Sequence, residues 1–114
     1  QQLRPLEQKG LLRAPFTPDH CQTNCHMYHV LLDNQEIRDA LIAHLRQRSI
    51  HAVFHFVPLH SSEMGANYRR GGGCLPVTES TSRRVVRLPM FFEMSNTAQQ
   101  SVLDNVIDFL TNVM

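Results

Sequence analysis

The chain has 114 residues, enough for one domain with a modest core. Hydrophobic residues make up 42% of it and charged residues 18%, and the formal net charge of +1 gives no reason to expect nucleic acid or an anionic membrane as a partner. No apolar run approaches the roughly 20 residues that a membrane-spanning helix needs. The polar first ten residues do not resemble a signal peptide, so we expect the three cysteines to be reduced thiols in the cytoplasm.

Residues 1–19 are expected to form a connector that leads into a domain formed by residues 20–114. Gly10 suits the C-terminus of a short helix, while Pro15 and Pro18 favour extended chain. Four leucines of this segment have no obvious partner within so short a chain: Leu3, Leu6, Leu11 and Leu12. We therefore expect copies of the chain to associate by exchanging their N-terminal segments.

The rest of the chain shows the periodicities of a small α/β (α+β) domain. Strand patterns occur at residues 24–32, 50–56 and 85–88, and helical spacing occurs at about 35–48, at 76–84 and after Ser95. The N-cap candidates are Asp33 or Asn34 for the first of these helices, Thr78 for the second and Ser95 for the last. The last helix carries an apolar stripe that must be buried against the sheet: Val102, Leu103, Val106, Ile107, Leu110, Val113 and Met114. The order of elements predicts a β-α-β-α-β-α sandwich.

Residues 53–60 form the most informative stretch for function. An apolar strand pattern ends at Pro58, and the stretch carries His55 and His60 just before a polar, glycine-rich segment that is expected to be a loop over residues 60–75. A strand that delivers side chains to the root of a loop is a common way to build a site. The alternative is a core strand whose histidines hydrogen-bond to the backbone.

A metal site is less well supported by the sequence. His20, Cys21, Cys25 and His26 are four potential ligands, but structural zinc usually draws ligands from two separate segments. Neighbouring residues of an extended chain also point to opposite faces. We therefore expect no bound metal here, but a solvent-facing connector in which Cys25 is buried.

The loop that follows His60 offers two further hypotheses. Arg69 and Arg70 precede Gly71–Gly73 and would suit a phosphate, but the lysine of a P-loop is absent and a surface loop explains the pattern as well. Cys74 would need a defined electropositive setting to act with His60 as a nucleophile, and the sequence does not fix that geometry.

Three segments together resemble one enzyme family. They are His-Phe-x-Pro-Leu-His at 55–60, Glu-Ser-x-x-x-Arg-Val-Val-Arg-Leu-Pro-Met-Phe at 79–91, and Met-Ser followed by an amphipathic helix from 94. This combination resembles the C-terminal part of the DegT/DnrJ/EryC1/StrS sugar aminotransferases, which are pyridoxal-phosphate enzymes of the aspartate aminotransferase fold (type I). Residues 18–27 and 52–55 are especially similar to the branch that makes dTDP-4-amino-4,6-dideoxygalactose for enterobacterial common antigen.

The resemblance implies the small domain of a larger enzyme. In the family, a large N-terminal domain supplies the Schiff-base lysine and most cofactor contacts, whereas the only lysine of this chain, Lys9, lies in the connector. The chain alone is therefore expected to carry no catalytic residue and to bind no pyridoxal phosphate. The resemblance further implies that His55, Phe56 and His60 contact substrate.

The complete enzyme would transfer an amino group from glutamate to a dTDP-4-keto-6-deoxyhexose and would be a homodimer or a higher homo-oligomer. A stand-alone α/β binding or regulatory module is the alternative interpretation of the sequence.

Overall fold

The structure, a computed structural model, describes residues 2–68 and 74–113 and is built around a small sheet. Its strands are β1 (Tyr28–Leu31), β2 (Val53–Phe54) and β3 (Val85–Leu88), arranged in the order β1-β3-β2. Both outer strands are antiparallel to β3 and hence parallel to each other. The N–H groups of Arg13 and Leu31 each donate to the other residue's carbonyl oxygen, at 2.8 and 2.9 Å, which adds the N-terminal segment to the edge of the sheet.

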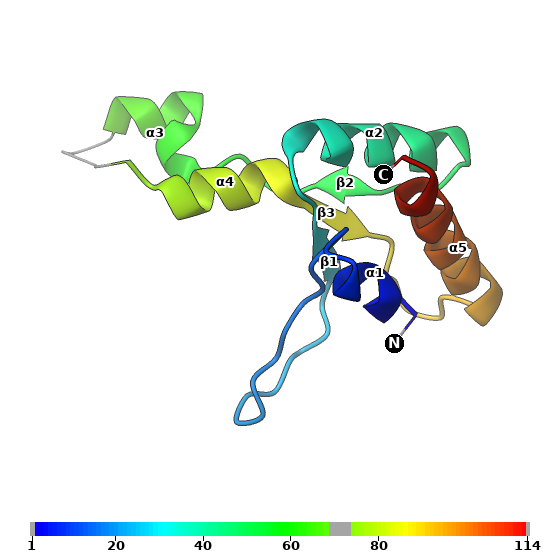
Figure 1. The fold of residues 1–114 in the computed structure, drawn as a ribbon. Coiled ribbons are helices and arrows are strands. Elements are labelled where there is room, and N and C mark those ends of the chain that lie inside the picture. Colours follow the sequence, from blue (N-terminus) through cyan, green and yellow to red (C-terminus); the bar gives the residue numbers. More distant parts are fainter. Residues whose placement is uncertain (1, 69–73, 114) are drawn as a thin grey trace.

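The helices confirm the predicted α/β domain (Figure 1). They are α1 (Arg4–Gln8), α2 (Gln35–Gln47), α3 (Glu63–Tyr68), α4 (Pro76–Arg84) and α5 (Asn96–Val113), with a short 3₁₀ helix, η1 (Leu59–Ser61). The second helix and the last helix, α2 and α5, cover one face of the sheet. Two of the predicted caps form: Asn34 Oδ1 accepts the Ile37 N–H at 2.9 Å, and Ser95 Oγ accepts the Ala98 N–H at 3.1 Å. The prediction of Thr78 as a cap is wrong, because α4 already begins at Pro76 and has Leu75, without a side-chain hydrogen bond, at its N-cap.

Alternation along the strands separates a core face from an open face. Val30 and its cross-strand partner Val86 are fully buried against the helices, whereas the next pair along, His29 and Arg87, points away from them. The core joins these valines to Leu41 and Leu45 of α2 and to one side of α5, formed by Val102, Val106, Phe109 and Leu110. The predicted stripe on the last helix is confirmed at the described positions, with Phe109 as an addition.

The N-terminal leucines belong to this same core, so the expectation that they lack partners is wrong. Leu3, Leu6 and Leu12 are each 4% exposed. The reason is a reversal of the chain after α1, where Gly10 adopts φ of +73°, followed by the pairing of Arg13 with the sheet edge. Together these features fold the leucines onto the domain and remove the basis for exchange of N-terminal segments.

Two predicted strands are shorter in the structure than in the sequence pattern. The strands expected at 24–32 and 50–56 are limited to four and two residues. The physical reason is the length of their shared partner: β3 has only four residues and therefore offers few backbone groups for pairing on either side.

The segment expected to be a loop at 60–75 contains helix α3 instead. Ser62 Oγ accepts the Gly65 N–H at 3.0 Å and so caps α3, and Glu63 lies in its first turn. The proposed phosphate cradle at residues 69–73 lies outside the described residues. Helix α4 matches its predicted bounds, and with η1 and α3 it projects away from the sheet (Figure 1).

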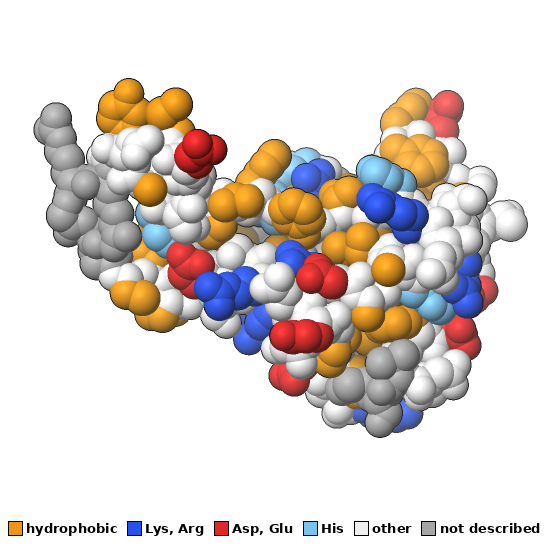
Figure 2. All heavy atoms as spheres, turned by 90° about the horizontal axis from the view of Figure 1, so that it is seen from above, with side chains coloured by type: hydrophobic (Ala, Val, Ile, Leu, Met, Phe, Trp, Pro, Cys, Tyr) orange, Lys and Arg blue, Asp and Glu red, His pale blue; other side chains and the backbone are white. Residues whose placement is uncertain are grey.

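Hydrophobic side chains remain on the surface of this projecting end (Figure 2).

Within residues 2–68 and 74–113, none of the helices combines the length and the apolar character that a membrane span requires.

Candidate functional site

The open face of the sheet forms the floor of a cavity of about 530 Å³. Its walls are residues 55–59, which follow β2, and one side of α4. Most of the lining is apolar: Leu31 and Val85 are buried in the floor, while Val57, Leu59 and Val77 of the walls are exposed. The volume lies in the range of small-molecule sites, roughly 300–1,000 Å³.

Basic side chains line one part of this cavity. His29 and Arg87 are directly opposite each other in the register of β1 and β3, and His55 follows β2. The Nδ1 atom of His55 is buried and has no hydrogen-bond partner among the described residues. None of the described residues that line the cavity is Asp or Glu. The cavity therefore combines an apolar floor with uncompensated basic groups.

The electrostatics of His29 follow from this setting. Burial lowers the pKa of His29 from its ordinary value of 6.5, and the nearby His55 lowers the pKa further. Both effects oppose a positive charge on the ring, so His29 is held in its neutral form unless a negative group approaches it.

Two of the three substrate-binding residues predicted from the sequence line this cavity. His55 and Phe56 are neighbours whose ring centroids lie 5.0 Å apart. Phe56 is 76% exposed, so most of its ring is free to pack against a ligand.

The third predicted residue, His60, lies beside α4 and not in the cavity lining. Its Nε2 atom is 2.7 Å from Glu79 Oε1, and Arg83 lies 3.6 Å from the other oxygen of the same carboxylate. Both side chains of the His60–Glu79 pair are half-buried. The pair therefore links η1 to α4 across the base of the projecting end.

Sequence reasoning did not identify His29, Arg87 or Glu79 as parts of a site. The available signal was strand alternation, which places His29 on the face opposite Val30. The partner of His29 across the sheet could not be predicted from the sequence, because the pairing of β1 with β3 joins segments that are far apart in the chain.

The four potential metal ligands at 20–26 are not gathered into a site. The described residues contain no group of three or more His, Cys, Asp or Glu placed to hold a metal ion. Cys21, Cys25 and Cys74 are exposed, so the expectation that Cys25 is buried is wrong. The ring of His26 lies 2.6 Å from Asn24 Oδ1 and is engaged locally.

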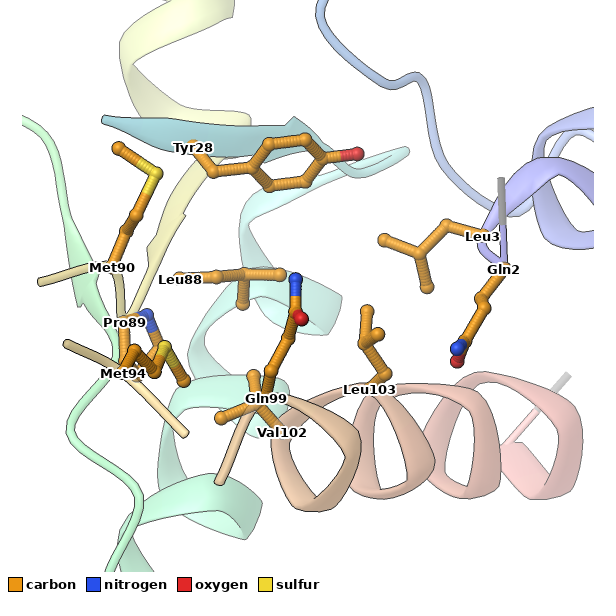
Figure 3. Close-up of a pocket in the computed structure, with 10 residues that line it drawn as sticks. All are labelled: Gln2, Leu3, Tyr28, Leu88, Pro89, Met90, Met94, Gln99, Val102 and Leu103. Atoms are coloured by element: carbon orange, nitrogen blue, oxygen red, sulfur yellow. The ribbon is translucent and has the colours of Figure 1, made fainter. Parts of the chain in front are cut away.

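A second cavity, of about 390 Å³, lies on the helical side of the sheet between α1 and α5 (Figure 3). Tyr28, Leu3 and Leu103 border it, and the amide of Gln99 points into it. Burial, and then the charge of Glu7, raises the pKa of Tyr28 from 10.0. Among the residues described there, no side chain titrates near neutral pH, so the open-face cavity is the better candidate for a functional site.

The residues of this chain do not fit covalent attachment of pyridoxal phosphate. Such attachment needs a lysine, and Lys9 is an exposed residue at the C-cap of α1, outside the lining of both cavities.

An antiparallel sheet covered by helices on one face and open on the other defines a small α+β domain of the kind found in aminotransferases. DesV from S. venezuelae, solved in complex with a ketimine intermediate, superimposes with a TM-score of 0.82 at 28% identity, over 96% of this chain and 29% of DesV. The model of the DegT/DnrJ/EryC1/StrS aminotransferase family matches residues 1–107, and the chain belongs to this family.

Two curated relatives match most of the chain. The chain is 29% identical over 94 residues to a "pleiotropic regulatory protein" of Geobacillus stearothermophilus, covering 82% of this chain and 25% of that protein. It is 32% identical over 88 residues to the dTDP-3-amino-3,4,6-trideoxy-alpha-D-glucose transaminase of Streptomyces venezuelae, covering 76% and 23%. The chain thus spans about a quarter of the length of these relatives.

Proposed function

We propose that the chain is the C-terminal small domain of a pyridoxal-phosphate-dependent sugar-nucleotide aminotransferase. In this proposal residues 20–114 form the domain and residues 1–19 connect it to an N-terminal large domain that holds the cofactor. Family membership and the share of the relatives that the chain spans support it. Leu3, Leu6 and Leu12 of the connector are buried against the small domain. We therefore expect the connector and the small domain to move together.

The reaction we propose is amino transfer from glutamate to C4 of a dTDP-4-keto-6-deoxyhexose, which gives dTDP-4-amino-4,6-dideoxygalactose for enterobacterial common antigen. The identity to a dTDP-sugar transaminase supports the substrate class, and the similarity of residues 18–27 and 52–55 to the branch that makes this sugar supports the product. The cofactor belongs to the complete enzyme, which we place in the cytoplasm as a homodimer or a higher homo-oligomer.

The observation that carries the proposal is the open-face cavity with His55 and Phe56 on its wall. The exposed ring of Phe56 offers a flat apolar surface for a sugar or a base. His55 lies in the lining, and an imidazole ring can hydrogen-bond to a hydroxyl group or a phosphate. His60 remains a proposed contact for a part of the substrate that extends toward α4.

The test uses the complete enzyme, with the transfer of nitrogen-15 from labelled glutamate to the dTDP sugar followed by mass spectrometry. His55→Ala and Phe56→Ala should each lower kcat/KM by about tenfold or more with little change in melting temperature. Arg46→Ala, at an exposed position of α2, is the matched control and should leave both unchanged. A complete protein that transfers nitrogen to no dTDP-4-keto sugar would overturn the assignment.

A second candidate is a binding or regulatory module, which the name of the Geobacillus relative favours. The same assay separates the two. A complete protein that holds pyridoxal phosphate but transfers no amino group to any nucleotide sugar tested would support the regulatory function.

A further inference from the structure

We propose that the open-face cavity is an anion site in which His29, His55 and Arg87 hold the phosphate group of an organic phosphate whose body lies along the apolar lining. This inference deepens the proposed function and rests on it for the natural ligand, the phosphorylated part of a sugar nucleotide. It also assigns His29 and Arg87, which the sequence did not suggest, to the site.

The first argument is the pairing of like charges across the sheet. His29 and Arg87 occupy opposite positions on antiparallel strands, where the Cβ atoms of partners are about 4.5–5.5 Å apart. Two basic side chains in such positions repel each other when both are charged. Burial and His55 keep His29 neutral in the free protein, and an anion bound between the two side chains would favour the protonated ring and interact favourably with both.

The second argument is the missing counter-charge. The described lining of the cavity contains three basic side chains and no carboxylate, and α4 contributes only apolar and hydroxyl groups, from Val77, Thr78, Thr81 and Ser82. Glu79, the carboxylate of α4, is engaged by His60 and Arg83; with Asp39 it lines an adjoining hollow that shares His55 with the cavity but includes neither His29 nor Arg87.

The third argument concerns the rest of the ligand. Leu31 and Val85 form a buried apolar floor, and Phe56, Val57 and Leu59 extend it at the wall. Inorganic phosphate would leave this surface exposed to water, whereas an organic phosphate with an apolar or flat body would cover it. Arg87 suits the phosphate end, because a guanidinium can donate two parallel hydrogen bonds to it.

The test titrates the 114-residue chain with phenyl phosphate and with inorganic phosphate, using calorimetry and nuclear magnetic resonance of the histidine rings. Phenyl phosphate should bind at least tenfold more tightly than inorganic phosphate. Arg87→Gln and His29→Gln should each weaken phenyl phosphate binding about tenfold, and Arg46→Gln on the surface of α2 should not. Circular dichroism identifies any variant that fails to fold, and in that case the other variant decides.

The titration of His29 gives a readout that a purely structural role would not change. Saturating phenyl phosphate should raise the pKa of His29, because the anion favours the protonated ring. Absence of binding, or binding that none of these variants weakens, would overturn the anion site. That result leaves the aminotransferase assignment standing, since nitrogen transfer by the complete enzyme is measured separately, and loss of that activity alone would leave the anion site intact.

Discussion

The two ends of the molecule are stabilised in different ways. Around the sheet, side chains such as Val30, Leu41 and Leu110 are fully buried. In the projecting end, the elements η1, α3 and α4 contain no buried residue, and the His60–Glu79 pair makes a polar link between them. The sheet end therefore holds most of the free energy of folding, and the projecting end can open locally at a much lower cost.

The largest expected effect distinguishes a buried leucine from an exposed one. Leu6→Ala, in the N-terminal helix, should destabilise the chain by about 2–3 kcal/mol, because it removes buried methyl groups and leaves a cavity. Leu59→Ala, at a position that is 85% exposed in η1, should change the free energy of unfolding by at most about 0.5 kcal/mol. Denaturant unfolding of the purified chain measures both.

Gln8→Ala is the control for α1, since Gln8 is exposed in the same helix and its replacement leaves the core intact. If Leu6→Ala were as mild as Gln8→Ala, the N-terminal segment would be a separate connector, as its sequence pattern suggested.

A smaller effect is expected from breaking the link at the base of the projecting end. Glu79→Gln removes the carboxylate that His60 and Arg83 share, and the half-buried pair is worth about 1 kcal/mol. Amide hydrogen exchange in η1 and α3 should speed up about fivefold, while exchange in α2 and α5 stays the same. Glu36→Gln, on the exposed side of α2, should have no effect on η1. Uniform acceleration throughout the chain would show that the two ends unfold as one unit.

The smallest effect concerns acid. Because the pKa of His29 is lowered in the folded state, the unfolded chain takes up this proton first as the pH falls below about 6.5. Stability is therefore full above the unfolded pKa, declines through the window between the two pKa values, and stays reduced below the folded pKa. His29→Gln should lose less stability than the wild type between pH 7.5 and pH 5, measured by the denaturant midpoint. An equal loss in both proteins would exclude His29 as a contributor.

The sequence predicted the elements whose signals are local. The stripe of α5 and the caps Asn34 and Ser95 depend on spacings of a few residues, and the structure has them. The signal at His55 and Phe56, an apolar strand pattern that ends at a proline, was equally local, and both residues line the cavity.

The features that the sequence did not predict depend on residues far apart in the chain or on weak local patterns. The burial of Leu3 requires β1 and α5 to be in place, and the opposition of His29 and Arg87 requires knowledge of the strand register. Helix α3 was missed because its short segment contains Gly65 and shows no apolar period; its cap, Ser62, was the only local sign.

The central position of β3 has a consequence for how the chain folds during synthesis. Although β3 lies between β1 and β2 in the sheet, it is the last of the three strands along the chain. Both earlier strands are antiparallel to β3 and make no backbone hydrogen bonds to each other, so neither can form its pairing with β3 until β3 has been synthesised. Closing the loop that contains the whole projecting end is a non-local step, and such steps slow folding. Until Leu88 and then α5 have left the ribosome, β1, α2 and β2 must present their apolar faces to solvent or to a chaperone.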